Sequence, residues 1–347
     1  MAPDTQALER WLLDYIPISV SLDQALRLSP LAGDAGFRRY FRLNTQPSLI
    51  AVWAPPEQEN TPNFVSKALA LQAQGVYTPR VYAVDYCRGY LLIEDFGDHL
   101  FAHQPAEHLD KRCYKAFDTL QAIQSMDIQP QVFSLYDRQL LTLELSLFPQ
   151  WFLSELLHLE LRSDEQQLLE QQGELLIQNA LEQPQVVVHR DFHCRNLMVL
   201  ADSQVGVIDF QDAVVGAVTY DLVSLLKDCY QRQPVEWVQQ QALAYAERLR
   251  QQGQLAGVGD SQFLRWFDWM GLQRHLKVLG IFARLSLRDG KHHYLNDLPL
   301  VIRYTLQVAE RYPELEPLNQ WFRERVLPAL PQHSWYSDWN VAGQGRA

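Results

Sequence analysis

Cysteine is scarce in this sequence and is not grouped. The 347 residues contain four cysteines and no C-x-x-C pair; they are Cys87, Cys113, Cys194 and Cys229. This spacing argues against a zinc ribbon and against a disulfide framework. It favours a protein that works in a reducing compartment, and we expect the cytoplasm.

The sequence also lacks the apolar segments that membranes and secretion require. No window approaches the roughly 18 apolar residues that span a bilayer. The first residues, MAPDTQALERWLLDY, do not place a basic segment before an apolar stretch, so they do not form a secretory signal. We therefore expect a soluble protein with no membrane partner.

Basic residues are fewer than acidic ones. Lys and Arg total 30 against 41 for Asp and Glu, which gives a formal net charge of -11. Because a nucleic-acid backbone is bound by a basic face, nucleic acid is not an expected partner. A nucleotide is not excluded, since a local cluster of donors and metal ions binds phosphate inside an acidic protein. Apolar residues make up 47% of the chain, which indicates a globular protein with a core.

The first hundred residues combine helix and strand patterns. Apolar positions repeat with helical spacing over 4–15 and 62–74. Strand-like runs cover 37–43, 48–54, 80–86 and 90–96. In the run 37–43, alternation places Arg38 and Tyr40 on one face of the strand and Arg39 and Phe41 on the other. This part predicts a small, mostly antiparallel sheet with helices.

After about residue 104 the pattern becomes helical. Helices are predicted over 105–125, 137–160 and 163–182, and again from about 219 to 328. They are interrupted once, at 186–210, by the short strand-like runs VVVH, NLMVL and VGVID. The predicted fold class is α+β, with a small antiparallel-sheet N-terminal lobe and a larger helical C-terminal lobe. We predict a nucleotide-binding lobe at 1–97, a helical lobe with the catalytic and acceptor sites at 98–330, and a tail at 331–347.

The interrupting segment carries the chemistry. It contains His189-Arg190-Asp191, then Asn196 five positions after that aspartate, then Asp209. Phosphoryl transfer needs one carboxylate to orient the attacking hydroxyl and accept its proton, and an amide oxygen and a second carboxylate to hold Mg²⁺. We assign Asp191 as the base and Asn196 and Asp209 as the metal ligands, because the H-x-D-x-x-x-x-N spacing and a short hairpin direct them to a common centre.

Simpler interpretations of the same residues exist. His189, Asp191 and His193 could form a zinc site, but no further ligands follow with metal spacing. His189 alone is more often a packed, hydrogen-bonded loop histidine than a catalytic group. Upstream, Asp95-Phe96-Gly97 spells a protein-kinase D-F-G, yet it precedes the H-R-D by about ninety residues.

The catalytic segment resembles the Brenner motif and metal-binding aspartate of the aminoglycoside-phosphotransferase and choline-kinase superfamily, relatives of protein kinases. The resemblance implies a bilobal protein-kinase-like fold and an ATP- and Mg²⁺-dependent kinase acting on a small molecule. It implies that Asp221, which opens the next helix, braces the catalytic loop together with His189. It also implies that Glu94, Asp95 and Phe96 form the hinge, whose backbone would hydrogen-bond the adenine.

The N-terminal lobe offers a loop for the nucleotide phosphates and departs from the superfamily in one respect. A short loop with two glycines precedes the strand at 37–43, and it consists of Gly33, Asp34, Ala35 and Gly36. Its glycines permit close backbone approach to phosphate, although a Gly-Asp turn is more often only a turn. The strand at 48–54 has no lysine and the helix at 62–74 has no glutamate, where the superfamily pairs the two. We hypothesise that Arg38 or Arg39 supplies the missing positive charge.

Segments along nearly the whole chain, from about residue 8 to 328, resemble the anomeric amino-sugar kinases of bacterial cell-wall recycling. They include GDAGFRRYFRL, LLIEDFGD, HRDFHCRNLM, IDFQDAVVGAVTYDLVSLLKD and GLQRHLKVLGIFARLSLRDGKHHYLNDLP. The resemblance implies phosphorylation of the C1 hydroxyl of N-acetylmuramate or N-acetylglucosamine. Those enzymes also lack the lysine and the glutamate.

The helix after residue 262 is the predicted acceptor side. An acceptor with a carboxylate needs a nearby cation, and this helix carries Arg274 and His275, followed by Lys277 and Arg284. These charges could instead be a solvated helix face, and the tryptophans beside them are more often core than a sugar platform. Alternative acceptors are an aminoglycoside, a choline-like alcohol or homoserine. A silent nucleotide-binding module is the competing class, although the three intact polar residues of the catalytic segment argue against it.

Overall fold

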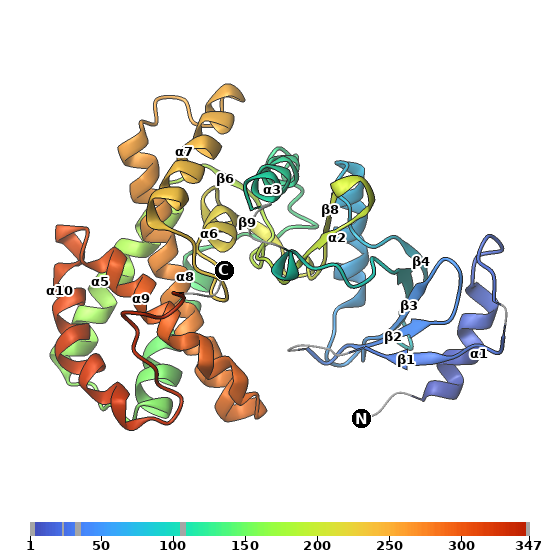
Figure 1. Ribbon diagram of the computed structural model, residues 1–347, viewed down its shortest axis with the longest axis horizontal. Coiled ribbons are helices and arrows are strands. Elements are labelled where there is room, and N and C mark those ends of the chain that lie inside the picture. The colour runs from blue at the N-terminus through green and yellow to red at the C-terminus, as the bar shows by residue number, and fades with distance from the viewer. Residues whose placement is uncertain (1–3, 23, 32–35, 105–108, 345–347) are drawn as a thin grey trace. The chain divides into compact units, whose positions relative to one another are not determined.

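The computed structural model describes residues 4–22, 24–31, 36–104 and 109–344. Compactness divides the chain into two units (Figure 1). Unit 1 comprises Met1–Ile123, Gln131–Phe133 and Arg195–Ala213, and unit 2 comprises Gln124–Pro130, Ser134–Cys194 and Val214–Ala347. The ranges predicted from the sequence, 1–97, 98–330 and 331–347, are functional lobes and a tail and are not units of compactness. This functional division remains a prediction.

Unit 1 contains a five-stranded antiparallel sheet with the strand order β1-β2-β3-β5-β4. Its strands are β1 (Leu28–Pro30), β2 (Arg39–Leu43), β3 (Leu49–Trp53), β4 (Val81–Asp85) and β5 (Tyr90–Glu94). The helix α1 (Thr5–Tyr15) begins at Asp4, whose carboxylate accepts a hydrogen bond from the N–H of Ala7 at 3.1 Å. Its apolar stripe of Leu8, Trp11 and Leu12 is buried in one cluster with residues of β2, β3 and β5, so α1 covers one face of the sheet.

The rest of unit 1 is built around a helix and a hairpin. The helix α2 (Thr61–Ala73) begins at Asn60, which caps the N–H of Asn63. The hairpin pairs β7 (Leu197–Val199) with β8 (Val205–Val207). The other elements are η1 (Phe101–His103), η4 (Ala201–Ser203) and α3 (Leu109–Gln124) up to Ile123. The hairpin therefore brings part of the predicted catalytic segment into the same compact unit as the sheet.

Unit 2 is mainly helical and contains one two-stranded antiparallel sheet, β6 (Gln185–Val188) with β9 (Val214–Ala217). Its larger helical elements are α4 (Arg138–Leu147), η3 (Phe148–Leu156), α5 (Ser163–Leu181), α6 (Tyr220–Leu226), α7 (Val235–Gln251), α8 (Asp260–Asp289) and α9 (Leu298–Ala309). Shorter ones are η5 (His292–Asp297), η6 (Pro313–Leu315), α10 (Glu316–Trp321), η7 (Phe322–Val326) and η8 (Leu327–Gln332).

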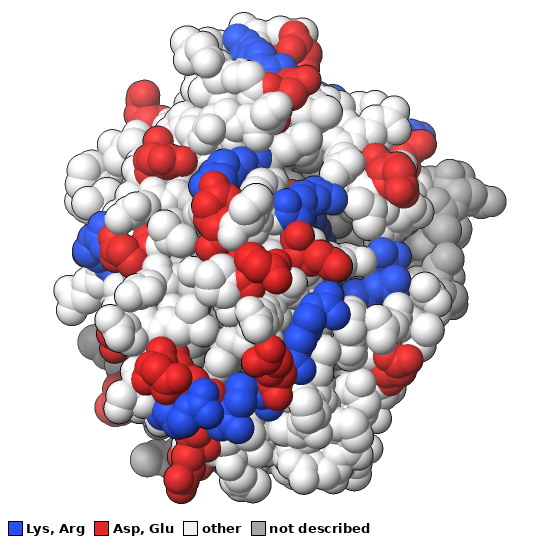
Figure 2. Space-filling model, turned by 90° about the vertical axis from the view of Figure 1, so that its left-hand side faces the viewer, with Lys and Arg blue, Asp and Glu red and all other residues white. Residues whose placement is uncertain are grey.

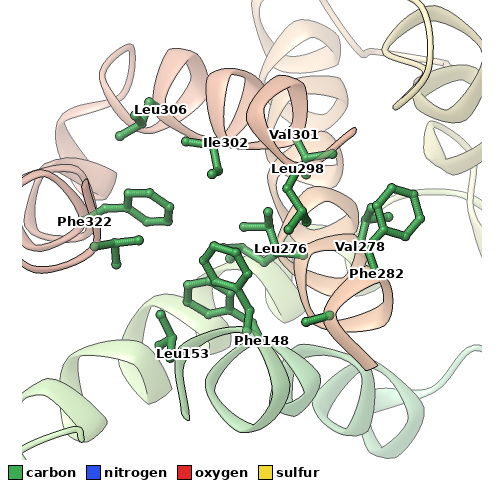
Figure 3. Close-up of a cluster of buried hydrophobic side chains, with 14 of the residues drawn as sticks. Phe148, Leu153, Leu276, Val278, Phe282, Leu298, Val301, Ile302, Leu306 and Phe322 are labelled. Atoms are coloured by element: carbon green, nitrogen blue, oxygen red, sulfur yellow. The ribbon is translucent and has the colours of Figure 1, made fainter. Parts of the chain in front are cut away.

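The helix α8 is the centre of unit 2. It packs against α4, η3, α5, α6, α7, α9 and η5, and most of its residues are buried. Side chains from η3, α8, α9 and η7 point toward one another in the core (Figure 3). Gly280 allows the close approach of α4, because a Cβ there would lie 2.4 Å from the carbonyl group of Leu147. Gly290, with φ of 69°, ends the helix.

Three differences from the sequence predictions have physical causes. The predicted helix at 137–160 is α-helical only to Leu147 and continues as the π-helical segment η3, where Pro149 has no N–H to donate. The strands β1 and β9 were not predicted. β1 is three residues long and ends in a proline, and β9 is a short apolar run without alternation.

The surface carries charges of both signs. Figure 2 shows acidic and basic side chains next to each other over one face of the molecule. Within the described ranges, no helix combines the length and the apolar composition that a membrane crossing requires.

Candidate active site

The loop after β6 is held by Asp221, the second residue of α6. The Asp221 carboxylate accepts hydrogen bonds from the backbone N–H of His189 at 2.6 Å and of Arg190 at 3.0 Å. The ring Nδ1 of the buried His189 accepts a hydrogen bond from the N–H of Asp191 at 3.2 Å. At the end of this part of unit 2, the N–H of Cys194 donates to the buried carboxylate of Asp228 at 2.9 Å. The Asp191 backbone is thus fixed on both sides.

Arg190 has a backbone conformation that is rare outside glycine. Its φ is 75°. A non-glycine residue in this region costs about 1–3 kcal/mol and persists only where the surrounding structure imposes it. Its guanidinium hydrogen-bonds the buried carboxylate of Glu144 on α4 and lies over the ring of Tyr136, 5.5 Å from its centroid. These contacts hold the residue that immediately precedes Asp191.

Glu144 also binds a second cation. The ammonium of Lys277 on α8 lies 2.9 Å from Glu144 Oε1 and 3.0 Å from the hydroxyl of Tyr220. Burial lowers the pKa of Lys277, but the Glu144 carboxylate and Tyr220 raise it above its ordinary value. Lys277 is therefore charged, although it is buried.

Asp191 is ionised across the physiological pH range. Burial raises its pKa, but Lys277, His193, Arg274 and Arg190 together lower it to about 2. A carboxylate with this pKa is a weak base that can accept a hydrogen bond from a hydroxyl and take up the proton late in a reaction.

A pocket in unit 2 opens beside Asp191. Its described lining residues are Asp191, His193, Cys229, Tyr230, Arg274, Lys277, Val278, Ile281 and Phe282. Val278 and Phe282 belong at the same time to the hydrophobic core (Figure 3), so the apolar wall of the pocket is part of a packed helix. The Nδ1 atom of His193 is buried without a hydrogen-bond partner among the described residues. The pocket therefore combines one carboxylate, two cations and an apolar wall.

The two predicted acceptor residues lie in different surroundings. Arg274 lines the pocket, and its Nη1 donates to the sulfur of Cys229 at 3.5 Å. The ring of His275 is stacked on Tyr304, and its Nε2 lies 3.2 Å from the carbonyl oxygen of Lys227. Burial, and then Arg274, lowers the pKa of His275 well below its ordinary value. His275 is not among the described residues that line the pocket.

The alternative of a solvated helix face is wrong for Arg274, His275 and Lys277, which are all buried. The predicted core position of the tryptophans is confirmed, since Trp266 and Trp269 are buried as well.

Asn196 and Asp209 come together in unit 1 through the β7–β8 hairpin. In this antiparallel pair, Asn196 precedes β7 and Asp209 follows β8, and the N–H of Ile208 donates to the carbonyl oxygen of Asn196 at 3.1 Å. Asn196 Nδ2 lies 3.4 Å from Asp209 Oδ2. Asp209 has φ of 64° and an exposed side chain. The side-chain amide of Asn196 and the carboxylate of Asp209 thus lie next to each other, and each has an oxygen atom that can bind a cation.

Arg38 and Arg39 point to different partners. Arg38 is buried, pairs with Glu59 at 2.9 Å and lies over the ring of Phe64. Arg39 is exposed and donates to the carbonyl oxygens of Gly36 and Arg38. Of the predicted phosphate loop, Gly36 is exposed, whereas Gly33, Asp34 and Ala35 lie outside the described residues.

The predicted hinge follows β5. Asp95 accepts hydrogen bonds from Arg42 at 2.6 and 3.0 Å and from Ser48 at 2.6 Å. Although burial opposes it, Arg42 lowers the pKa of Asp95. Glu94 accepts from the N–H of Arg80 at 3.2 Å.

Phe96 lies against the β7–β8 hairpin, where a Cβ on Gly206 would be only 2.8 Å from its ring. The hinge segment is therefore fixed by its side chains, and the N–H of Glu94 also donates to the carbonyl oxygen of Arg80 at 2.9 Å.

Three residues that the sequence interpretation did not name belong to the surroundings of the site. They are Glu144, Asp228 and Tyr230. Lys277 was named only as one of the charges on the acceptor helix, and His193 only in the zinc alternative. Over the described part of the chain, no group of three or more His, Cys, Asp or Glu is arranged to hold a metal ion, which gives the zinc alternative no support.

A protein-family comparison and a search of characterised proteins agree on the relationship of this chain. The model of the phosphotransferase enzyme family matches residues 27–256. The chain is 41% identical, over 312 residues, to an N-acetylmuramate/N-acetylglucosamine kinase from Pseudomonas aeruginosa. The alignment covers 88% of this chain and 89% of that protein. It is 37% identical to a protein of the same name from Neisseria meningitidis, over 92% of this chain and 95% of that protein.

Solved structures resemble the fold. A choline kinase from Cryptosporidium parvum matches with a TM-score of 0.64 at 12% identity, over 92% of this chain and 100% of that one. An ADP-bound aminoglycoside phosphotransferase matches with a TM-score of 0.58 at 14% identity, over 88% and 99%. These likenesses confirm the predicted α+β, protein-kinase-like fold class. With the sequence relationships, they establish that the chain belongs to the phosphotransferase enzyme family and transfers a phosphoryl group to a hydroxyl acceptor.

Proposed function

We propose that this enzyme transfers the γ-phosphoryl group of ATP to the anomeric C1 hydroxyl of N-acetylmuramate and N-acetylglucosamine. The relatives named for these two sugars support the acceptor, since they align over most of both chains. ADP-bound and ATP-bound structures of the same fold support the nucleotide. Because the reaction consumes ATP, we place it in the cytoplasm.

The observation that carries the acceptor proposal is the chemistry of the pocket beside Asp191. N-acetylmuramate has a carboxylate and two methyl groups, and the pocket offers Arg274 and Lys277 next to Val278, Ile281 and Phe282. A guanidinium binds a carboxylate through paired N–H donors, and an apolar wall fits methyl groups. A polycationic aminoglycoside would meet two positive charges here, which disfavours that alternative.

In this proposal Asp191 orients the acceptor hydroxyl and accepts its proton. The low pKa of about 2 agrees with a late proton transfer, because the hydroxyl becomes acidic only as its bond to phosphorus forms. Of the two predicted acceptor residues, Arg274 binds the acceptor in this proposal, because it lines the pocket and His275 instead stacks on Tyr304.

We assign Asn196 and Asp209 to Mg²⁺. Both residues carry hard oxygen donors, and Mg²⁺ in nucleotide sites is bound by one or two carboxylates together with phosphates and water, so the pair fits the ion. When bound, the ion neutralises charge on the phosphate oxygens. The Asn196 amide would turn its oxygen toward the ion, since Nδ2 faces Asp209 here.

For ATP we keep the predicted contacts as part of the proposal. The loop Gly33–Gly36 would cover the phosphates, Arg38 or Arg39 would add positive charge, and the backbone of Glu94–Phe96 would bind the adenine. The positions of Gly36, Arg39 and the hinge near exposed surface support these contacts.

The bracing of the loop by Asp221 predicts a pH dependence. Burial raises the pKa of Asp221 to about 7, even though the N–H groups of His189 and Arg190 lower it. Above pH 7 the carboxylate is ionised and accepts both bonds, and below pH 7 a proton occupies one acceptor oxygen. We expect kcat, measured from pH 5.5 to 9, to fall as the pH drops through about 7. Asp191 does not cause this fall, because its pKa is about 2.

The matched variant is Asp221→Asn, which we expect to be slower at every pH and to lack the acid limb. An unchanged limb in this variant would assign the titration to another group, including the nucleotide itself.

An acceptor panel tests the function directly. The enzyme is incubated with Mg-ATP and N-acetylmuramate, N-acetylglucosamine, kanamycin, choline or homoserine, and phosphorus NMR identifies the product. We expect a C1-phosphate from the two sugars. In Arg274→Met we expect KM for N-acetylmuramate to rise about tenfold or more, because a hydrogen bond to a charged group is lost. KM for N-acetylglucosamine, which has no carboxylate, should stay the same.

Arg288→Met is the control for the panel, since Arg288 is an exposed residue of the same helix. A phosphate on kanamycin, choline or homoserine would discard the amino-sugar acceptor while keeping the kinase. An equal rise in KM for both sugars would show that Arg274 does not bind the carboxylate.

A further inference from the structure

Lys67 occupies a position in unit 1 that core packing does not explain. It is the only charged residue of α2 (Thr61–Ala73), and its side chain is 4% exposed. Its neighbours Phe64, Ala68 and Leu71 are also buried. Lysines are almost never buried to this extent unless the ammonium group has partners, so the partners of Lys67 show what its burial holds in place.

The ammonium of Lys67 is directed at the segment that follows Asp209. Lys67 Nζ donates to the carbonyl oxygen of Gln211 at 2.7 Å, and Asn63 Nδ2 donates to the same oxygen at 2.9 Å. Asn63 and Lys67 lie one helical turn apart on α2, so they reach the oxygen from one face of the helix.

Further contacts hold the segment from Asp209 to Gln211. The ring of Phe210 is fully buried and packs against Phe64 of α2 with 4.8 Å between centroids. Gln211 Nε2 donates to Asp209 Oδ1 at 2.7 Å. The left-handed conformation of Asp209, with φ of 64°, is thus imposed by contacts on the two residues that follow it.

We propose that Lys67, together with Asn63, is a positioning residue that fixes Asp209 for binding of the metal–nucleotide complex. This coupling of α2 to the Asp209 segment replaces the strand lysine and helix glutamate that the chain lacks. The proposal rests on the assignment of Asp209 to Mg²⁺. The Lys67 ammonium also adds positive charge beside the segment that follows Asp209.

Calorimetric binding to the full chain tests this without any acceptor. Lys67→Met keeps the length of the side chain and removes the charge. We expect the affinity for ADP in saturating Mg²⁺ to fall about tenfold or more, in line with the loss of a hydrogen bond from a charged donor. Adenosine, which has no phosphates, should bind as it does to the wild type. Lys67→Arg should retain most of the affinity for ADP, and Lys115→Met, at an exposed residue of α3, should change neither.

Asn63→Ala provides a second route if the buried substitution disturbs folding. It removes the other donor to Gln211, and we expect a smaller loss of ADP affinity and a higher Mg²⁺ requirement, with an unchanged melting temperature. Unchanged ADP binding in both variants would overturn the proposal. An equal loss of adenosine and ADP binding would also overturn it, because that result means a general distortion of unit 1. Neither outcome depends on which sugar is the acceptor.

Discussion

Replacing Asp191 by asparagine should reduce kcat about 10²- to 10⁴-fold, the usual contribution of a positioned general base. Asparagine keeps the shape of the side chain, but its oxygen carries no charge and cannot take up the proton of the acceptor hydroxyl. The measurement is steady-state formation of the sugar phosphate with both substrates saturating. KM for ATP and the affinity for ADP should be unchanged, because the nucleotide contacts do not include Asp191.

The control is Asp127→Asn, which removes an exposed carboxylate from the same unit and should leave kcat unchanged. The network behind Asp191 must also remain intact in the variant. Lys277 and Arg190 are held by Glu144 independently of Asp191, so the melting temperature should show no loss of fold. A variant that retains more than about a tenth of the wild-type kcat would remove Asp191 from the role of base.

The fold class could be predicted from the sequence because its signals are local, and the assignment of Asp191, Asn196 and Asp209, which stays a prediction, uses local signals as well. Helical and strand periodicity depend on neighbouring residues, and the H-x-D-x-x-x-x-N spacing lies within one loop. The hairpin that brings Asn196 next to Asp209 is also local, since only five residues separate β7 from β8. Such features need no knowledge of distant parts of the chain.

The surroundings of Asp191 could not be predicted in the same way. Glu144 and Lys277 come from α4 and α8, and they meet Arg190 only through packing over long sequence separations. In the sequence, charges on α8 were compatible with a solvated helix face. These charges are buried because α8 is surrounded by seven other elements. A helix that is buried on all sides has no polar solvent face, so its pattern of apolar residues does not show which charges are exposed.

The buried charges of unit 2 explain why Arg190 tolerates its strained backbone. Glu144 is shared by Arg190 and Lys277, and removing one partner would leave a charge buried without compensation. The network therefore holds the backbone of Arg190 and the charge of Lys277 at once. It supports the residue before Asp191, and its two cations are among the four groups that lower the pKa of Asp191.

Replacing Asp209 by asparagine should reduce kcat/KM for Mg-ATP about 100-fold or more, since metal-assisted charge stabilisation amounts to several kcal/mol and each 1.4 kcal/mol is tenfold. Asparagine adopts the left-handed backbone of this position as readily as aspartate does, so the variant changes the charge and not the backbone. We also expect the Mg²⁺ concentration for half-maximal activity to rise, because Mg²⁺ binds a carboxylate better than an amide.

A binding measurement separates this effect from damage to the fold. ADP with Mg²⁺ should raise the melting temperature of the wild type more than ADP alone, because at a given concentration a ligand that binds more tightly stabilises the folded state more. In Asp209→Asn the additional rise caused by Mg²⁺ should disappear, while the melting temperature without ligand stays the same. Asp14→Asn, at an exposed residue of unit 1, should keep the Mg²⁺-dependent rise. If Asp209→Asn keeps it too, the ion is held by other residues, and the positioning role of Lys67 would then lose its target.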